Sequence, residues 1–206
     1  MEKFLIVANI KQNPLPTYNF VAPSGVEVAI APQPPQIPQI PQGFVRAAQN
    51  VDNNARQLRD LGVKYCLVGH SYYRNNFGET NEMVGHKTSE LLEAGIVPII
   101  CARNLEEIPK NLRPASLAQG GFAVMYEPEY AISTNGVYHP ETPDKINDVL
   151  STFPQEARLL YGGSVNLENC KLIINNCKLV SGFVVGHGCL NPEEFFNIIN
   201  QCLPTN

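Results

Sequence analysis

Short apolar runs recur along the whole chain, and each of them closes on polar residues or glycine. Several runs, such as Val97–Cys101, do not alternate polar and apolar positions, which is typical of strands buried on both faces. The sequence therefore predicts eight buried strands within these runs: Phe4–Asn9, Val26–Pro32, Phe44–Gln49, Tyr65–Gly69, Ile96–Cys101, Gly121–Glu127, Ala157–Gly163 and Val180–Gly186.

Helical signals lie between the runs. The segment Glu79–Ala94 carries apolar residues on roughly one face and is followed by Gly95, an expected C-cap. Thr142-Pro143 and Asn191-Pro192 each combine a capping residue with a proline at the first helical position, which predicts two further helix starts.

Strands that alternate with helices favour a parallel sheet, and eight such units most economically close into a (β/α)8 barrel. This α/β fold usually takes roughly 250 residues, with about 200 near the lower limit. The chain has 206 residues, so we expect one barrel domain over 1–206.

The segments that connect the first three predicted strands have few helix-forming patterns. Residues 13–25 contain three prolines, and residues 32–43 contain five prolines within Pro-Gln-Pro-Pro-Gln-Ile-Pro-Gln-Ile-Pro-Gln. We therefore expect the first two outer helices to be reduced or missing. The proline tract could be a ligand for proline-recognition modules, but its position favours a polyproline-like cover whose Ile37 and Ile40 face the sheet.

Composition narrows the functional classes. A net charge of -4 without a basic run argues against a nucleic-acid partner. The six cysteines have neither the spacing of a zinc site nor the density of a disulfide scaffold, which favours free thiols. The apolar stretch after Met1-Glu2-Lys3 is too short for a signal peptide or a membrane span, so we expect a cytoplasmic protein without membrane contact.

Polar residues that end barrel strands meet at one mouth, where the active sites of this fold lie. Glu127 alone could be the first solvated residue after a strand. Together with His70 and Lys11, however, it makes a set suited to moving a proton beside a carbonyl group. The glycine-rich segments 161–165 and 185–188 add backbone donors where this fold usually binds phosphate.

In this order the motifs closely resemble those of the triosephosphate isomerase family. The resemblance spans nearly the whole chain and rests on Ala8-Asn9-Ile10-Lys11, Ala47-Ala48-Gln49-Asn50, Val68-Gly69-His70-Ser71, Phe77-Gly78-Glu79-Thr80, Tyr126-Glu127-Pro128 with Ala131-Ile132, and Tyr161-Gly162-Gly163-Ser164-Val165.

The resemblance implies interconversion of dihydroxyacetone phosphate and glyceraldehyde 3-phosphate, a step of glycolysis and gluconeogenesis, without a metal or organic cofactor. It makes Glu127 the proton-shuttling base, His70 a neutral electrophile and Lys11 the source of positive charge, with Asn9 beside it. Backbone N–H groups for the phosphate would come from three further residues, namely Ser133 in a lid over 128–136, Ser164 and Gly186. A lid that closes would exclude water.

Several positions depart from the family pattern. Tyr72 stands where the resemblance implies a glutamate near the active-site lysine, and the lid has fewer glycines than expected. His187 replaces the second glycine of a pair, either as a tolerated substitution that turns outward or as an added phosphate donor.

The segment between Asn50 and Gly62 is short, although the family places here a long loop that inserts into a partner subunit. We therefore expect a monomer, or a homo-oligomer built from another surface. Two other functions stay open: a weak or inactive barrel that binds phosphate ligands or acts in protein interactions, and another phosphosugar enzyme. The joint presence of Asn9, Lys11, His70 and Glu127 speaks against an inactive barrel.

Overall fold

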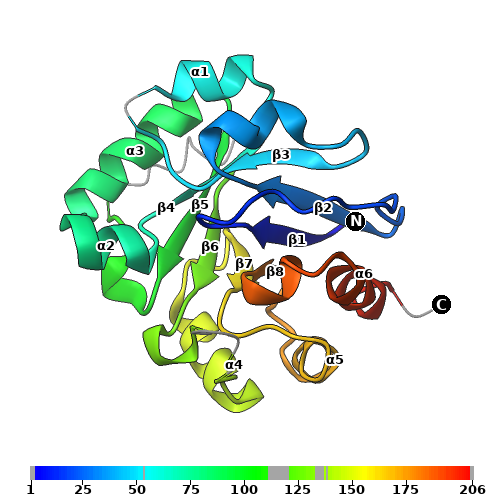
Figure 1. Cartoon of the computed structure of the whole chain (residues 1–206). Helices are drawn as coiled ribbons and strands as arrows, with labels where there is room; N and C mark the ends of the chain where they lie inside the picture. The colour runs from blue at the N-terminus through cyan, green and yellow to red at the C-terminus, as the bar shows by residue number, and fades with distance from the viewer. Residues whose placement is uncertain (1–2, 53, 111–120, 133–136, 138, 205–206) are drawn as a thin grey trace.

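A computed structural model describes residues 3–52, 54–110, 121–132, 137 and 139–204. Its eight strands form a closed sheet in sequence order, and every neighbouring pair, including the first and the last, runs parallel (Figure 1). The strands are β1 (Phe4–Asn9), β2 (Val26–Ala31), β3 (Val45–Ala48), β4 (Tyr65–Val68), β5 (Val97–Ala102), β6 (Ala123–Tyr126), β7 (Arg158–Tyr161) and β8 (Gly182–Val185). Each overlaps a predicted run, so the expected barrel is confirmed.

The helices lie around the outside of the sheet in Figure 1. The α-helices are α1 (Ala55–Asp60), α2 (Ser71–Phe77), α3 (Asn81–Glu93), α4 (Pro143–Thr152), α5 (Cys170–Asn176) and α6 (Pro192–Gln201). Short 3-10 helices are η1 (Pro34–Gln39), η2 (Leu105–Glu107), η4 (Glu129–Ala131) and η5 (His187–Cys189). Both expected helix starts are confirmed, because the side chains of Thr142 and Asn191 accept backbone N–H groups of the first turns of α4 and α6.

The predicted helix over 79–94 is α3. It begins two residues later than expected because Thr80 is its N-cap and accepts the N–H of Met83. Gly95 directly follows the C-cap residue Ala94 and has a φ of 76°, the left-handed conformation in which a glycine avoids the steric cost of a Cβ.

The first two outer helices are reduced, as expected. Residues 10–25, all of which are described, contain no helix, and the proline tract forms the six-residue η1. Ile37 and Ile40 are buried as expected, but the extended, polyproline-like conformation was wrong. The reason is local: the φ of proline also suits a first helical turn, and Gln33 and Gln36 cap it reciprocally.

An aromatic cluster seals the flank that the missing helix would cover. The extended segment 13–25 contributes Tyr18 and Phe20, whose rings pack against Phe44 and against Phe195 and Phe196 of α6, with centroid separations of 4.9–6.4 Å. The Tyr18 hydroxyl donates a hydrogen bond of 2.7 Å to the Cys189 carbonyl, so the buried phenol is satisfied. Side chains of an irregular segment therefore replace a helix.

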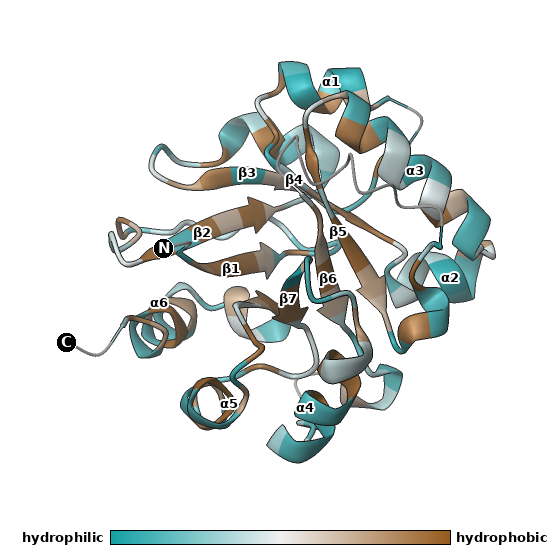
Figure 2. Ribbon diagram, turned by 180° about the vertical axis from the view of Figure 1, so that it is seen from behind, coloured by the Kyte–Doolittle hydropathy of each residue, from teal (hydrophilic) through white to brown (hydrophobic). Residues whose placement is uncertain are grey.

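Alternate strand residues fill two separate cores. In β1, Leu5 and Val7 belong to the cluster inside the barrel, whereas Ile6 and Ala8 belong to the cluster between strands and outer helices. Figure 2 shows the strands as the apolar centre and mostly polar outward faces on the helices. Asn9 is the next alternate residue after Leu5 and Val7, so its side chain also points inward, at the mouth of the barrel.

Candidate active site

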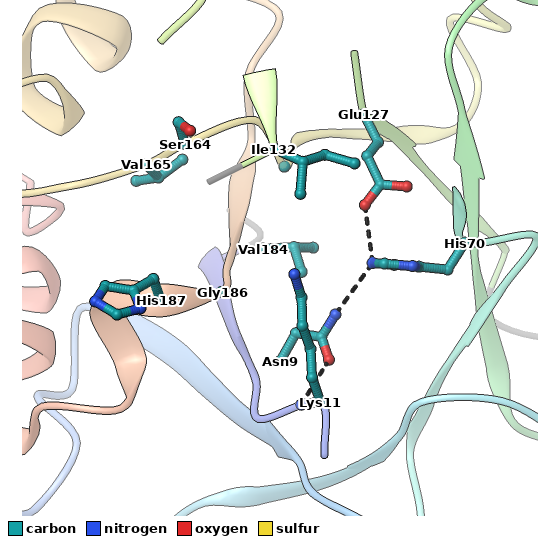
Figure 3. A pocket seen from close by; sticks show the side chains of 11 residues that line it. Asn9, Lys11, His70, Glu127, Ile132, Ser164, Val165, Val184, Gly186 and His187 are labelled. Atoms are coloured by element: carbon teal, nitrogen blue, oxygen red, sulfur yellow. Dashed lines mark hydrogen bonds and ion pairs between the residues drawn. The ribbon is translucent and has the colours of Figure 1, made fainter. Parts of the chain in front are cut away.

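A pocket opens at the carboxyl ends of the strands (Figure 3). It is lined by Asn9, Lys11, His70, Glu127, Ile132, Gly162, Ser164, Val165, Val184, Gly186 and His187. The structure thus brings together seven of the residues that the sequence singles out, from strands far apart in the chain. Ser133, the remaining one, lies outside the described residues.

Glu127 directly follows β6 and continues its inward series. The residue is 4% exposed, and its two side-chain oxygens have different partners. Oε1 lies 2.8 Å from Nε2 of His70, and Oε2 accepts the backbone N–H of Ser71 at 3.0 Å. Burial acts to raise the pKa of Glu127, but His70 and the Ser71 N–H outweigh it and hold the pKa below its usual value.

His70 follows β4 and is the N-cap of α2. Its Nδ1 accepts the backbone N–H of Tyr72 at 3.1 Å. This contact leaves Nε2, which faces Glu127, as the ring nitrogen that can donate.

Asn9 and Lys11 come from the end of β1 and the turn after it. The Asn9 amide nitrogen lies 3.4 Å from His70 Nε2, and its Oδ1 accepts the backbone N–H of Lys11 at 3.3 Å. In Figure 3 the Lys11 side chain extends into the pocket toward Gly186. A Cβ at Gly186 would lie 3.9 Å from the Lys11 ammonium nitrogen, so a small residue there leaves room beside the charge.

The opposite side of the pocket consists of the segments after β7 and β8. Ser164 is buried and has a φ of 48°, and its carbonyl accepts the Asn169 amide at 2.7 Å. His187 starts η5, and Figure 3 shows its ring directed away from the pair of His70 and Glu127. Lys11 gives this side of the pocket a formal positive charge.

Sequence reasoning missed two contributors to the site. Ile132 lines the pocket as an apolar wall, and the backbone N–H of Ser71 binds the Glu127 carboxylate. Ser71 belongs to the motif around His70, and its place at the start of a helix was a usable signal, because the first N–H groups of a helix lack partners within it. Gln49 and Asn50, which also end a strand, do not line this pocket.

Within the described ranges, no three His, Cys, Asp or Glu side chains come together to hold a metal ion. None of the helices among those residues is both long and apolar enough to cross a membrane. All six cysteines are buried and form no disulfide.

The closed parallel barrel, with a buried carboxylate against an imidazole at its mouth, defines a (β/α)8-barrel protein with a polar site at the carboxyl ends of its strands. The family model described as triosephosphate isomerase matches residues 7–202. The chain belongs to the triosephosphate isomerase family and is an isomerase.

Curated relatives agree with this assignment. The triosephosphate isomerase of Neurospora crassa is 32% identical over 214 residues, covering 86% of this chain and 86% of the relative. That of Coxiella burnetii is 33% identical over 77% of this chain and 71% of its own length. That of Delftia acidovorans is 35% identical over 71% of this chain and 67% of its own length.

Proposed function

We propose that this chain interconverts dihydroxyacetone phosphate and glyceraldehyde 3-phosphate through an enediolate, with Glu127 as the base and His70 as the electrophile. The observation that carries the proposal is the contact of 2.8 Å between the buried Glu127 carboxylate and Nε2 of His70. The family is itself an established example of this pairing, so these roles agree with the family and are not new to this chain.

The geometry suggests how the base gains strength when substrate binds. A substrate carbon must enter between Glu127 and His70, and this separates the carboxylate from the imidazole. Loss of the His70 contact removes a contribution that lowers the pKa of Glu127, while burial, which raises the pKa, stays. Glu127 then becomes a better proton acceptor at the moment when a substrate proton is within reach.

The charge that develops on the substrate oxygen needs donors. His70 Nε2–H, released from Glu127, donates to this oxygen, and the Lys11 ammonium adds positive charge beside it. His70 Nε2 passes a proton to the former carbonyl oxygen and takes one from the hydroxyl of the neighbouring carbon, and Glu127 returns the abstracted proton to the former carbonyl carbon. The carbonyl and hydroxyl groups thus exchange places without a cofactor.

The phosphate group belongs on the side of Lys11, Ser164 and Gly186, where a cation and backbone groups line the pocket. His187 lines the same side of the pocket, and its ring points away from the acid–base pair.

The substitution Glu127→Gln tests the proposal. We expect turnover of glyceraldehyde 3-phosphate in a coupled assay to fall by roughly 10²–10⁴-fold, because the amide cannot accept the proton. The matched control is Glu82→Gln, the same change at an exposed position of α3, which should keep the wild-type rate. A near wild-type rate in Glu127→Gln would refute the assignment of the base.

The same samples distinguish the alternative of an inactive barrel. A folded wild-type chain that binds 2-phosphoglycolate but does not turn over glyceraldehyde 3-phosphate would be a phosphate-binding protein, not an active isomerase.

A further inference from the structure

The turn that carries Lys11 has an unusual backbone. Lys11 has a φ of 54°, the left-handed region that residues with a Cβ rarely adopt. Such a conformation is strained and persists only where the surroundings impose it. The contacts around Lys11 and Gln12 should therefore include groups that hold this turn in place.

Gln49, at the end of β3, makes the most direct contact. Its side-chain amide nitrogen donates to the Lys11 carbonyl at 2.8 Å and to the Ala31 carbonyl at 2.9 Å. Both amide hydrogens are thus used, and they connect the Lys11 turn to the end of β2. The strained residue itself is the one that Gln49 holds.

Two further side chains hold Gln12. The Gln33 amide donates to the Gln12 carbonyl at 2.8 Å, and the Gln12 amide donates to the Tyr72 hydroxyl at 2.7 Å. Gln33 precedes η1 and Tyr72 lies in α2, so the turn after β1 is connected to three separate parts of the barrel mouth.

One side of this turn faces open space. A cavity of about 660 Å³ adjoins the pocket, and Lys11, Gln12, Gln33, Gln49 and Tyr72 all line it. Among the described residues, none of the ion pairs involves the Lys11 ammonium. With open space on one side and no carboxylate partner, the hydrogen bonds to the backbone are what fix the direction of the Lys11 side chain.

We propose that Gln49 and Tyr72 are positioning residues for Lys11: Gln49 acts on its carbonyl, and Tyr72 acts through Gln12. The proposal rests on the proposed function, in which Lys11 binds the anionic substrate. Neither residue touches the substrate, so loss of either bond misdirects the ammonium and weakens substrate binding more than it slows the chemical step.

The test uses Gln49→Met, which keeps the length of the side chain and removes its N–H donors, and Tyr72→Phe, which removes only the hydroxyl. We expect Gln49→Met to raise both KM and the Kd for 2-phosphoglycolate about tenfold, because two bonds are lost. Tyr72→Phe should raise both about threefold, since its bond lies at the surface. In both variants kcat should change less than KM.

A double-mutant cycle checks the route through Gln12. Gln12→Ala should raise KM and the Kd for 2-phosphoglycolate as much as Tyr72→Phe does. The double variant should raise them no more than either single variant. The controls are Gln57→Met on the exposed face of α1 and Tyr73→Phe next to Tyr72, which should keep the wild-type KM. Additive losses in the double variant, or an unchanged KM in Gln49→Met, would overturn the proposal.

Stability is measured in parallel. A lowered melting temperature with an unchanged KM and Kd would make Gln49 a purely structural residue and would also overturn the proposal. If Gln49→Met does not fold, Tyr72→Phe and the double-mutant cycle test the proposal. These variants should fold, because the atoms that they change lie at the surface. Binding of 2-phosphoglycolate needs no turnover, so a wild-type chain that binds but does not react refutes only the proposed function. A wild-type chain that does neither refutes both.

Discussion

At the residue scale, the state of the acid–base pair depends on backbone groups at the start of α2. The N–H of Tyr72 fixes the tautomer of His70, and the N–H of Ser71 binds the carboxylate of Glu127. The motif around His70 predicted the residue, but the sequence could not show that the next turn of backbone orients both partners. That arrangement exists only when β4 and β6 are in place.

The lowered pKa of Glu127 predicts a pH dependence of stability. A carboxylate whose folded pKa is depressed stabilises the folded chain above its unfolded pKa, about 4.3 for glutamate, and this contribution is lost as the pH falls through the lower folded value. The difference in the free energy of unfolding between wild type and Glu127→Gln should therefore be constant from about pH 6 to 8. Below about pH 4.5 it should move against the wild type.

Urea unfolding from pH 3 to pH 8 measures this difference. Glu82→Gln, at an exposed position, is the control for general acid effects. A difference between wild type and Glu127→Gln that stays constant down to pH 3 would contradict the lowered pKa.

At the element scale, the strands and the helix starts follow from local patterns. All eight strands could be predicted because a buried parallel strand is a short apolar run. The starts of α4 and α6 could be predicted because the side chains of Thr142 and Asn191 accept N–H groups only two or three residues further along the chain. The conformation of the proline tract could not be predicted, because the φ of proline fits both an extended chain and a helical first turn. The hydrogen bond from the Gln33 N–H to the Gln36 side chain favours the helical turn.

Because η1 stands in place of an outer helix, we expect its buried side chain Ile37 to contribute strongly to the free energy of unfolding. Ile37 is fully buried against the barrel, so Ile37→Ala should lower the free energy of unfolding by about 2–5 kcal/mol through lost burial and a cavity. The exposed Gln39→Ala, two residues away in η1, should change it by less than about 0.5 kcal/mol.

Equilibrium urea unfolding of both variants provides the comparison. Equal stabilities of Ile37→Ala and Gln39→Ala would mean that η1 does not cover the barrel in solution.

At the scale of the whole molecule, the short connection after β3 is the feature on which the expected oligomeric state rests. Asn50 binds the Lys87 ammonium through its Oδ1 and Asp52 through its amide, and the N–H of Ala55 donates to the Glu90 carboxylate at 2.9 Å. These bonds connect the described part of the segment to α3. That the chain inserts no loop into a partner stays a prediction.

We expect a monomer, or an oligomer that uses another surface. Light scattering after size exclusion should give a mass that Arg56→Glu, at an exposed position of α1, leaves unchanged. Activity that persists on dilution indicates a monomer, whereas activity lost on dilution indicates an obligate oligomer. Dissociation of a dimer by Arg56→Glu, or an interface centred on 51–62, would contradict the expectation.

The sequence by itself determined the barrel, the positions of its strands and the identity of the polar residues at its mouth. These depend on local composition and on the parity of each strand, which continues from Leu5 and Val7 to Asn9. The tertiary structure alone decided the contact of His70 with Glu127, the lowered pKa of Glu127, the aromatic cover around Tyr18 and the bonds that hold the Lys11 turn. The reason is that each of these is a contact between segments far apart in the chain, and no local pattern encodes it.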